Sequence, residues 1–234
     1  MVGDGGRCAR KLNVAITACE KCPRLVEYIR QVAQTKRRAY RGWEYWGKPV
    51  PNFGDPDARI LVVGLAPAAH GGNRTGRIFT GDESGNWLFR ALYEAGLANQ
   101  PTSTHRDDGL ELRDAFITAV AHCAPPANKP TREELQNCQH WMKATLRCVH
   151  GWRVIVVLGR VAFEWTLRAL TDIGLDHSWK PSAFAHGAEL PLGDGRWLLC
   201  SYHPSQQNTF TGKLTREMLN SVFVRAVQLA QMQE

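Results

Sequence analysis

The segment RILVVGLAPAAHGGNRTGRIFTGD (residues 59–82) decides the fold, because it joins an apolar run directly to a loop of small residues. The run at residues 59–63 is nearly continuous in apolar side chains, as expected for a strand buried on both faces of a sheet. The nineteen residues after it contain five glycines, one proline and three alanines. So few large side chains let the backbone approach a ligand closely, although the same composition suits a sharp crossover between elements. The segment predicts a buried strand and a candidate binding loop.

This loop does not match the common phosphate-binding loops. The Walker pattern needs a Gly-Lys-Ser/Thr run at its end, and the dinucleotide fingerprint needs G-x-G-x-x-G after the strand. Gly64 is followed instead by Leu65-Ala66-Pro67, and Pro67 removes a backbone donor and stiffens the turn. We therefore expect the loop to lie against a flat or bulky group, with amide donors at only a few points.

Further apolar runs alternate with amphipathic segments along the chain. Thr131 and Glu134 have the spacing of a capping box at the start of one such segment. Alternation of strands and helices predicts an α/β protein with a parallel sheet covered on both faces. The runs are residues 115–121, 153–158 and 196–202, and the predicted helices are residues 84–97, 131–149, 159–170 and 215–231.

The composition is that of a globular chain. It has 234 residues, of which 44% are hydrophobic, enough for a sizeable core in one domain spanning residues 1–234. The sequence has no run of 18 apolar residues and no signal-like N-terminus, so we expect a soluble cytoplasmic protein without a membrane partner. Residues 1–12 are expected to form a flexible tail. The formal charge of +7 favours a polyanionic partner such as nucleic acid.

An unusual loop follows each predicted strand. The loops are GLAPAAHGG, HCAPPANKP, LGR and HPSQQNTFTG. In open α/β sheets, ligands bind beyond the carboxyl ends of the strands. The glycine-rich loop, Asn128 and His203 should therefore converge on one rim of the sheet, although they are far apart in the sequence.

Four of the seven cysteines have the spacing of metal ligands. Cys19 and Cys22 form a C-x-x-C motif in a predicted helix, and Cys123 is followed by Cys138 after fourteen intervening residues. Two pairs of thiolates suit a tetrahedral zinc ion or an iron–sulfur cluster, and buried thiols without a metal are the alternative. Because the second pair is not a C-x-x-C, we favour a 4Fe–4S cluster.

The other three cysteines have no partner at ligand spacing. An odd number of cysteines and the absence of an export signal argue against a disulfide scaffold. Cys148 ends a predicted helix and Cys200 lies in a predicted strand, so both are predicted to be small core residues, while Cys8 is left without a role.

Four features together resemble a known family. They are the segments GLAPAAHGGNRTGRIFTGD and HCAPPANKP, the tetrapeptide YHPS and the four-cysteine pattern. They resemble those of the iron–sulfur uracil-DNA glycosylases, most closely the family 5 type, over roughly residues 19–215. The resemblance implies a three-layer α/β/α sandwich with a short central parallel sheet, excision of deaminated bases from DNA, and a 4Fe–4S cluster on Cys19, Cys22, Cys123 and Cys138.

The resemblance also implies a role for each matching residue. Phe79 would stack on the flipped base. Asn128 would read the polar edge of a pyrimidine, and His203 would stabilise the charge on the departing base. The water-positioning loop matches Gly64, Leu65, Ala66 and Ala68.

One departure changes the expected mechanism. Most uracil-DNA glycosylases carry Asp or Asn in the first loop, where this sequence has Ala68 and Ala69, as the family 5 branch does. Within that branch Asp82 resembles the substitute acid. A dissociative path lowers the need for a general base, because water attacks a sugar cation that already exists, so Asp82 would favour the cation or orient water. The space at Ala68 fits the wider substrate range that the resemblance implies, namely uracil, hypoxanthine and 5-hydroxymethyluracil.

Contacts with DNA phosphates must offset the few kcal/mol that flipping a base out of the duplex costs. A basic run at residues 36–41, interleaved with aromatic residues, could stack on DNA or support the cluster, and a solvated basic face is the preferred interpretation. The predicted DNA contacts are His70, Arg74, Arg77, Ser205 and Gln206, with Lys129, Asn208 and Lys213 as further candidates.

Two other functions stay open. A non-catalytic nucleic-acid-binding protein could be held together by a four-cysteine zinc site, which is colourless. A phosphate-ester hydrolase could use His70, Asp82, His122 and His203 as metal ligands, and chelation would abolish its activity. Each of these residues also has an ordinary structural role when it is considered alone. Phe79 could be a core residue, His203 could lie at a strand end, and Asp82 could cap a helix. Their position on loops after successive strands favours the glycosylase, which we expect to act on DNA as a monomer with no small-molecule cofactor beyond the cluster.

Overall fold

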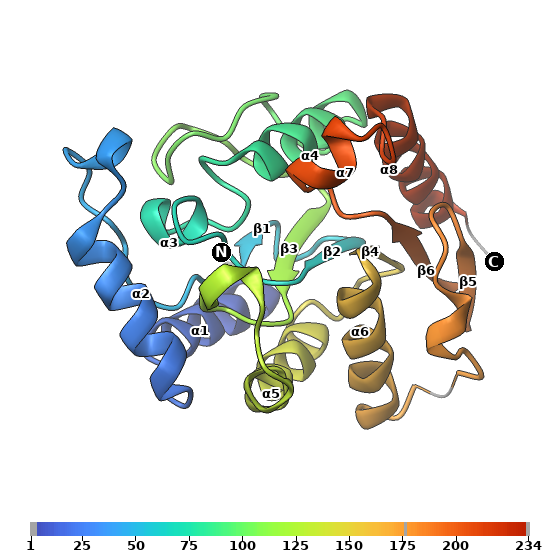
Figure 1. Cartoon of the computed structure of the whole chain (residues 1–234). Coiled ribbons are helices and arrows are strands. Elements are labelled where there is room, and N and C mark those ends of the chain that lie inside the picture. The colour runs from blue at the N-terminus through green and yellow to red at the C-terminus, as the bar shows by residue number, and fades with distance from the viewer. Residues whose placement is uncertain (1–3, 176, 233–234) are drawn as a thin grey trace.

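The sheet is built from short strands in the order β1-β3-β2-β4-β6-β5 (Figure 1). The computed structural model describes residues 4–175 and 177–232. The four inner strands are parallel, and the edge strands β1 and β5 pair antiparallel with their neighbours. The bounds are β1 (Phe53–Gly54), β2 (Ile60–Gly64), β3 (Ala115–Ala119), β4 (Val154–Leu158), β5 (Glu189–Gly193) and β6 (Arg196–Ser201).

Helices cover both faces of the sheet. α4 and α8 pack together on one face, and α5 and α6 lie on the other, where α1 packs against α5 (Figure 1). None of the helices in the described ranges is long and apolar enough to cross a membrane. The helices are α1 (Asp4–Thr17), α2 (Pro23–Thr35), α3 (Gly72–Thr75), α4 (Glu83–Glu94), α5 (Arg132–Cys148), α6 (Arg160–Asp172), α7 (Gln206–Phe210) and α8 (Arg216–Gln231), with short 3₁₀ turns η1 (Arg38–Tyr40), η2 (Pro126–Asn128) and η3 (Pro181–Ala183).

The inner strands divide the apolar core into two parts. Every residue of β2, β3 and β4 is buried, and successive side chains point to opposite faces. Ile60 and Val62 thus pack toward α4 and α8, whereas Leu61 and Val63 pack toward α5 and α6. The predicted α/β/α sandwich is confirmed.

The edges of the sheet add two antiparallel strands to the parallel sheet that the sequence predicts. The sequence does not indicate β1 or β5, because β1 has only two residues and β5 contains Pro191 and a register shift next to Gly193. Short edge strands, proline and bulges all limit pairing with further chains, and each weakens the sequence signal of a strand. The sheet is therefore mixed, with a parallel centre.

The N-terminal segment is a helix, which corrects the tail predicted at residues 1–12. α1 buries Ala9, Leu12 and Ile16, and residues 1–3 lie outside the described part of the chain. The C-x-x-C motif is not inside a helix either. Cys19 lies in the connection between α1 and α2, and Cys22 is the N-cap residue of α2.

Cys8 and Cys148 form a disulfide, although the sequence argued against a disulfide scaffold and predicted Cys148 to be a small core residue. Their Cα atoms are 5.5 Å apart, although 140 residues separate them in the sequence. The bond joins α1 to the end of α5, so it fastens the segment that leads to Cys19 to the helix that carries Cys138. Cys200 is buried in β6 and free, as predicted.

Replacing Cys8 by serine should lower the free energy of unfolding by roughly 2–4 kcal/mol, the usual effect of a native disulfide. Guanidinium unfolding followed by circular dichroism measures the difference. Arg10→Ser, an exposed change on the same helix, is the control for placing a serine in α1. Equal stabilities of the two variants would mean that the cross-link adds nothing to the free energy of unfolding.

Candidate active site

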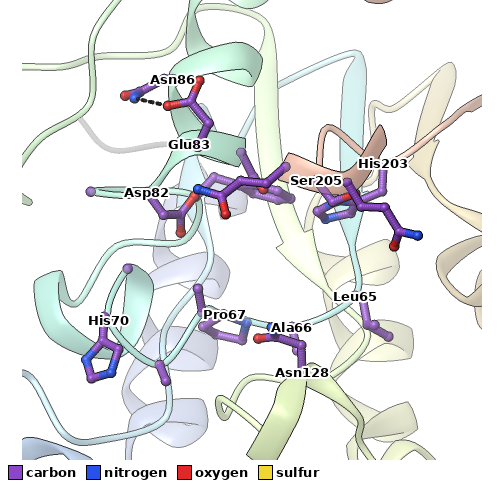
Figure 2. Close-up of a pocket in the computed structure, with 18 of the residues that line it drawn as sticks. Leu65, Ala66, Pro67, His70, Asp82, Glu83, Asn86, Asn128, His203 and Ser205 are labelled. Carbon is purple, nitrogen blue, oxygen red and sulfur yellow. Dashed lines mark hydrogen bonds between the residues drawn. The ribbon is translucent and has the colours of Figure 1, made fainter. Parts of the chain in front are cut away.

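A cleft of about 840 Å³ opens at the carboxyl ends of the inner strands (Figure 2). Its walls come from the loops after β2, β3 and β6, which the sequence predicts to converge. β3 pairs on one side of β2, and β4, the next strand in the chain, pairs on the other. The end of β2 is therefore the point where the strand order reverses, which is where open α/β sheets bind ligands.

The floor of the cleft is the loop that follows β2. The N–H of Val120 donates to the carbonyl of Gly64 at 3.0 Å, which extends the β2–β3 pairing into the start of the loop. Residues 65–68 then line the floor (Figure 2). None of them has a polar side chain, so polar side chains that face a ligand must come from the other loops.

Phe79 and His203 meet in the cleft. Their ring centroids are 5.9 Å apart and their planes are inclined by 31°. Two glycines make room for the pair: a Cβ on Gly64 would lie 2.6 Å from Cζ of Phe79, and one on Gly159 would lie 3.4 Å from Cβ of His203. The structure thus brings together two predicted site residues that are 124 residues apart in the sequence.

Phe79 is held in an unusual backbone conformation. Its φ of 53° lies in the left-handed region, which costs a residue with a large side chain about 1–3 kcal/mol. The carbonyl oxygen of Phe79 would lie 1.8 Å from a Cβ on Gly85, so the first turn of α4 accepts this conformation only because residue 85 has no side chain. Strain of this kind is typical of ligand clamps.

His203 is neutral at physiological pH. Burial lowers the pKa of its imidazole to about 4. Its backbone is fixed by Asn208, whose side-chain amide donates to the His203 carbonyl at 2.9 Å. A neutral imidazole keeps one ring N–H donor and one ring acceptor, so His203 can donate a hydrogen bond without carrying a charge.

Asp82 lies across the cleft from His203 (Figure 2). It is the N-cap residue of α4, and its Oδ1 accepts from the N–H of Gly85 at 2.9 Å. Its Oδ2 occupies space that Gly71 leaves open, since a Cβ there would be 2.0 Å away. Burial raises the pKa of Asp82, and the backbone N–H of Gly85 and the Arg74 guanidinium oppose that shift. Asp82 is therefore both the N-cap residue of α4 and a carboxylate that lines the cleft.

Asn128 comes from the η2 turn after β3. Its φ is 56° and that of Ala127 is 52°, so two consecutive residues are left-handed. Asparagine tolerates this region better than other non-glycine residues, but alanine does not. The turn presents the exposed Asn128 to the cleft (Figure 2).

The sequence matches the model of the uracil DNA glycosylase superfamily over residues 51–226. The chain belongs to the uracil-DNA glycosylase superfamily. It is 53% identical to a type-5 uracil-DNA glycosylase of Thermus thermophilus over 92% of this chain and 95% of that protein. Type-5 enzymes of Mycobacterium leprae and Pyrobaculum aerophilum are 48% and 49% identical, over 98% and 89% of this chain and 99% and 87% of their own. The family expected from the motifs is confirmed.

Three of the residues that the sequence predicts to contact DNA line the cleft, namely His70, Ser205 and Gln206. The hydroxyl of Tyr45 lies 3.0 Å from Nδ1 of His70 and fixes the orientation of its ring. Ser205 is the N-cap residue of α7, the helix at the rim opposite Asp82.

The other two predicted contacts, Arg74 and Arg77, are corrected by the structure. They are only 3% and 4% exposed. The Arg77 guanidinium donates to Asp108 at 2.7 Å and to Ser103 at 2.8 Å. Arg74 is likewise bonded inside the protein. Both guanidinium groups hold the loop together and are not available to phosphates in this conformation.

The basic run at residues 36–41 contributes to the cleft, contrary to its interpretation as a purely solvated face. Arg37 and Tyr40 line the cleft, while Arg38 and Arg41 are exposed. The interleaving of basic and aromatic residues is the signal that could have pointed to this wall. Further lining residues that the sequence does not single out are Glu83, Ser84, Asn86 and Gln207.

The four predicted ligand cysteines lie together beside the cleft. Burial raises the pKa of the Cys123 thiol, and Cys138, Cys19 and Cys22 raise it further because they are close. The side-chain amide of Asn137 donates to Sγ of Cys22 at 3.7 Å, as expected where a thiolate needs a partner. Cys22 and Cys123 also pack in one apolar cluster with Leu25, Ile29 and Ala124. In donor chemistry, these residues fit a group that takes four thiolates.

The four residues predicted as metal ligands for the alternative phosphate-ester hydrolase do not form one site. His122 is buried with Nδ1 2.8 Å from the Val50 carbonyl, whereas His70, Asp82 and His203 line the cleft. Within residues 4–175 and 177–232, no three His, Cys, Asp or Glu side chains are grouped around a single-ion position.

Proposed function

We propose that this member of the uracil-DNA glycosylase superfamily hydrolyses the N-glycosidic bond of uracil in DNA and leaves an abasic site. The observation that carries the proposal is the pairing of Phe79 and His203 in a cleft at the end of β2. An aromatic ring offers a face on which a planar base stacks, and an imidazole beside it offers a donor to the oxygen of that base.

Cleavage leaves the electron pair of the C1′–N1 bond on the base and a cation on the sugar. Water then attacks C1′, and the proton that it loses neutralises the departing base anion, directly or through solvent. A donor preorganised at the oxygen where negative charge develops contributes about 3–4 kcal/mol to such a step. His203 is assigned this role, because its neutral ring donates without having to give up a proton.

Asp82 supplies the negative charge on the other side of the cleft. Its Oδ2 does not serve as the acceptor for the α4 cap, which uses Oδ1. We assign Oδ2 to the sugar cation or to the attacking water, and Asn128 to the polar edge of the base. The small side chains at residues 66–69 leave room for bases larger than uracil, such as hypoxanthine and 5-hydroxymethyluracil.

The DNA backbone is assigned to the rims of the cleft. His70 lies on one wall and Ser205 and Gln206 lie on the other. Arg37 extends the first wall with a free positive charge, and Lys129 and Lys213 are exposed near the second and third loops. Phosphate contacts at these positions would offset the energy of base flipping.

A 4Fe–4S cluster is proposed on Cys19, Cys22, Cys123 and Cys138. The cluster would supply four iron–sulfur bonds that join α2, the loop after β3 and α5. Hydrolysis transfers no electron, so the cluster would hold the loop of Asn128 against α2 or position the DNA-binding loops electrostatically.

The test is incubation of the purified protein with a duplex that carries one uracil, followed by alkaline cleavage at abasic sites. Strand breakage at the uracil, and none in a duplex with thymine at that position, is the expected result. The activity should persist in a chelator that removes loosely bound divalent ions, because no step uses such an ion. An intact uracil strand would overturn the proposal.

Asp82→Asn is expected to slow excision by roughly 10–100-fold, less than the 10²–10⁴-fold of a lost essential base. Asparagine keeps the N-cap acceptor and removes only the charge, so the stability should change little. Thr215→Ala, which removes the N-cap of α8 away from the cleft, is the control that lowers stability without slowing excision. Complete inactivity of Asp82→Asn with normal DNA binding would make Asp82 an essential base.

A further inference from the structure

Arg74 is a buried cation inside the loop between β2 and α4. It lies on α3, and its side chain reaches both ends of the surrounding segment. Nε donates to the carbonyl of His70 at 2.7 Å, and Nη2 donates to the carbonyl of Gly81 at 2.8 Å. One guanidinium group therefore closes the loop from His70, two residues past the cleft floor, to Gly81, the residue that precedes Asp82.

Two aromatic rings hold this guanidinium in place. Cζ of Arg74 lies 3.9 Å from the ring centroid of Tyr40 and 4.1 Å from that of Trp43. A planar, always charged group that both stacks and donates in two directions has to be arginine, because lysine offers a single point charge. Tyr40 and Trp43 of the basic and aromatic run thus support the active-site loop through Arg74.

The position of Arg74 bears directly on Asp82. A Cβ on Gly81 would lie 2.4 Å from Nη2, so the backbone next to Asp82 packs on the guanidinium itself. The groups that act on the Asp82 carboxylate are Arg74, the neighbouring Glu83, and the backbone N–H groups of Ser84 and Gly85. Arg74 is the cation among them, and it favours the ionised carboxylate while burial and Glu83 disfavour it.

We propose that Arg74 is a positioning residue for excision: it fixes Asp82 at the cleft and places a permanent positive charge beside it. The inference rests on the proposed function and adds to it the residue through which Asp82 is controlled. Arg74 is only 3% exposed and bonded within its own loop, so its effect on the rate should pass through Asp82.

The experiment is a double-mutant cycle with Arg74→Met, Arg74→Lys and Asp82→Asn, measured as the single-turnover rate on a uracil duplex. Arg74→Met should slow excision about tenfold or more, since a misplacement of about 1 Å can cost about a hundredfold. In the pH profile of the Arg74→Met rate, the acid limb, where the rate falls as the pH falls, should move to higher pH. Arg74→Lys should also be slower, but its acid limb should stay closer to that of the unchanged protein, because the charge remains.

The decisive comparison is in the Asp82→Asn background. There Arg74→Met should cost less than about twofold, the usual scatter of such cycles. A full and additive loss in that background, or an acid limb that does not move in Arg74→Met, would overturn the inference. Failure of the unchanged protein to excise uracil would instead overturn the proposed function.

Thermal unfolding and circular dichroism show whether each variant folds. If Arg74→Met does not fold, the same cycle is run with Arg74→Lys and with Trp43→Leu, which removes one stacking ring and leaves both hydrogen bonds. Additive losses of these variants with Asp82→Asn would equally overturn the inference. Arg90→Met, an exposed arginine on α4, is the matched control and should leave rate and pH profile unchanged.

Discussion

Replacement of His203 by alanine is expected to slow uracil excision by about 10²–10³-fold, the effect of removing one donor aimed at a developing anion. The ring is the polar group next to Phe79 in the cleft, and the floor at residues 65–68 offers no side-chain donor. Single-turnover cleavage of a duplex with one uracil measures the loss. Binding to the same duplex should change far less, because the donor acts mainly on charge that appears during bond cleavage.

Two further variants separate the donor from the shape of the ring. His203→Gln keeps an N–H donor near the same place and should retain more activity than His203→Ala. His150→Ala, at an exposed position, should excise uracil at the unchanged rate. Undiminished turnover of His203→Ala would remove this residue from the mechanism, and equal losses in the alanine and glutamine variants would assign it a packing role.

The protonation state of His203 gives a second check of the same residue. Burial lowers its pKa from 6.5 to about 4, so between these values the unfolded chain binds a proton that the folded protein does not. The free energy of unfolding therefore falls as the pH falls through this window. His203→Ala lacks this linkage, and its stability should fall less steeply over the same range. Parallel stability curves would contradict a lowered pKa for the His203 imidazole.

The parts of the fold that the sequence predicts are those in which local pattern and burial agree. β2, β3 and β4 are short runs with every residue buried, and the capping box at Thr131 and Glu134 forms as its spacing predicts. The position of the cleft could also be predicted from the sequence. Loops that follow parallel strands must meet at one edge, so Phe79, Asn128 and His203 could be placed together before any distance was known.

The errors concern contacts that depend on distant partners. An arginine in a loop has the same local signature whether it faces DNA or a buried carboxylate, and Arg77 pairs with Asp108 from a separate loop. Cys8 and Cys148 are 140 residues apart, so no spacing rule relates them. The helix α1 depends on packing against α5. Local sequence carries none of this information, because tertiary packing decides it.

Cys138→Ser is expected to lose bound iron and visible absorbance and to unfold at a lower temperature. Serine offers a harder oxygen donor in place of one of four thiolates, and iron–sulfur clusters are held by thiolates. Iron analysis, the visible spectrum and a thermal melt measure the three effects. Cys200→Ser is the matched control, since it places the same hydroxyl at another buried free cysteine, one that lies in β6 and outside the predicted ligand set.

The same variant should also lose excision activity, for a reason that lies in the loops. Cys22 and Cys123 pack in one cluster against Ala69, the residue that follows the cleft floor. A few residues after Cys123 come the left-handed Ala127 and Asn128, a conformation that persists only if its surroundings impose it. Without the iron–sulfur cluster this support is lost, so Asn128 should leave the cleft before the sheet unfolds. A Cys138→Ser protein that keeps its iron and its rate would exclude Cys138 as a ligand, whereas one that loses iron but excises uracil normally would show that the Asn128 loop is held by packing alone.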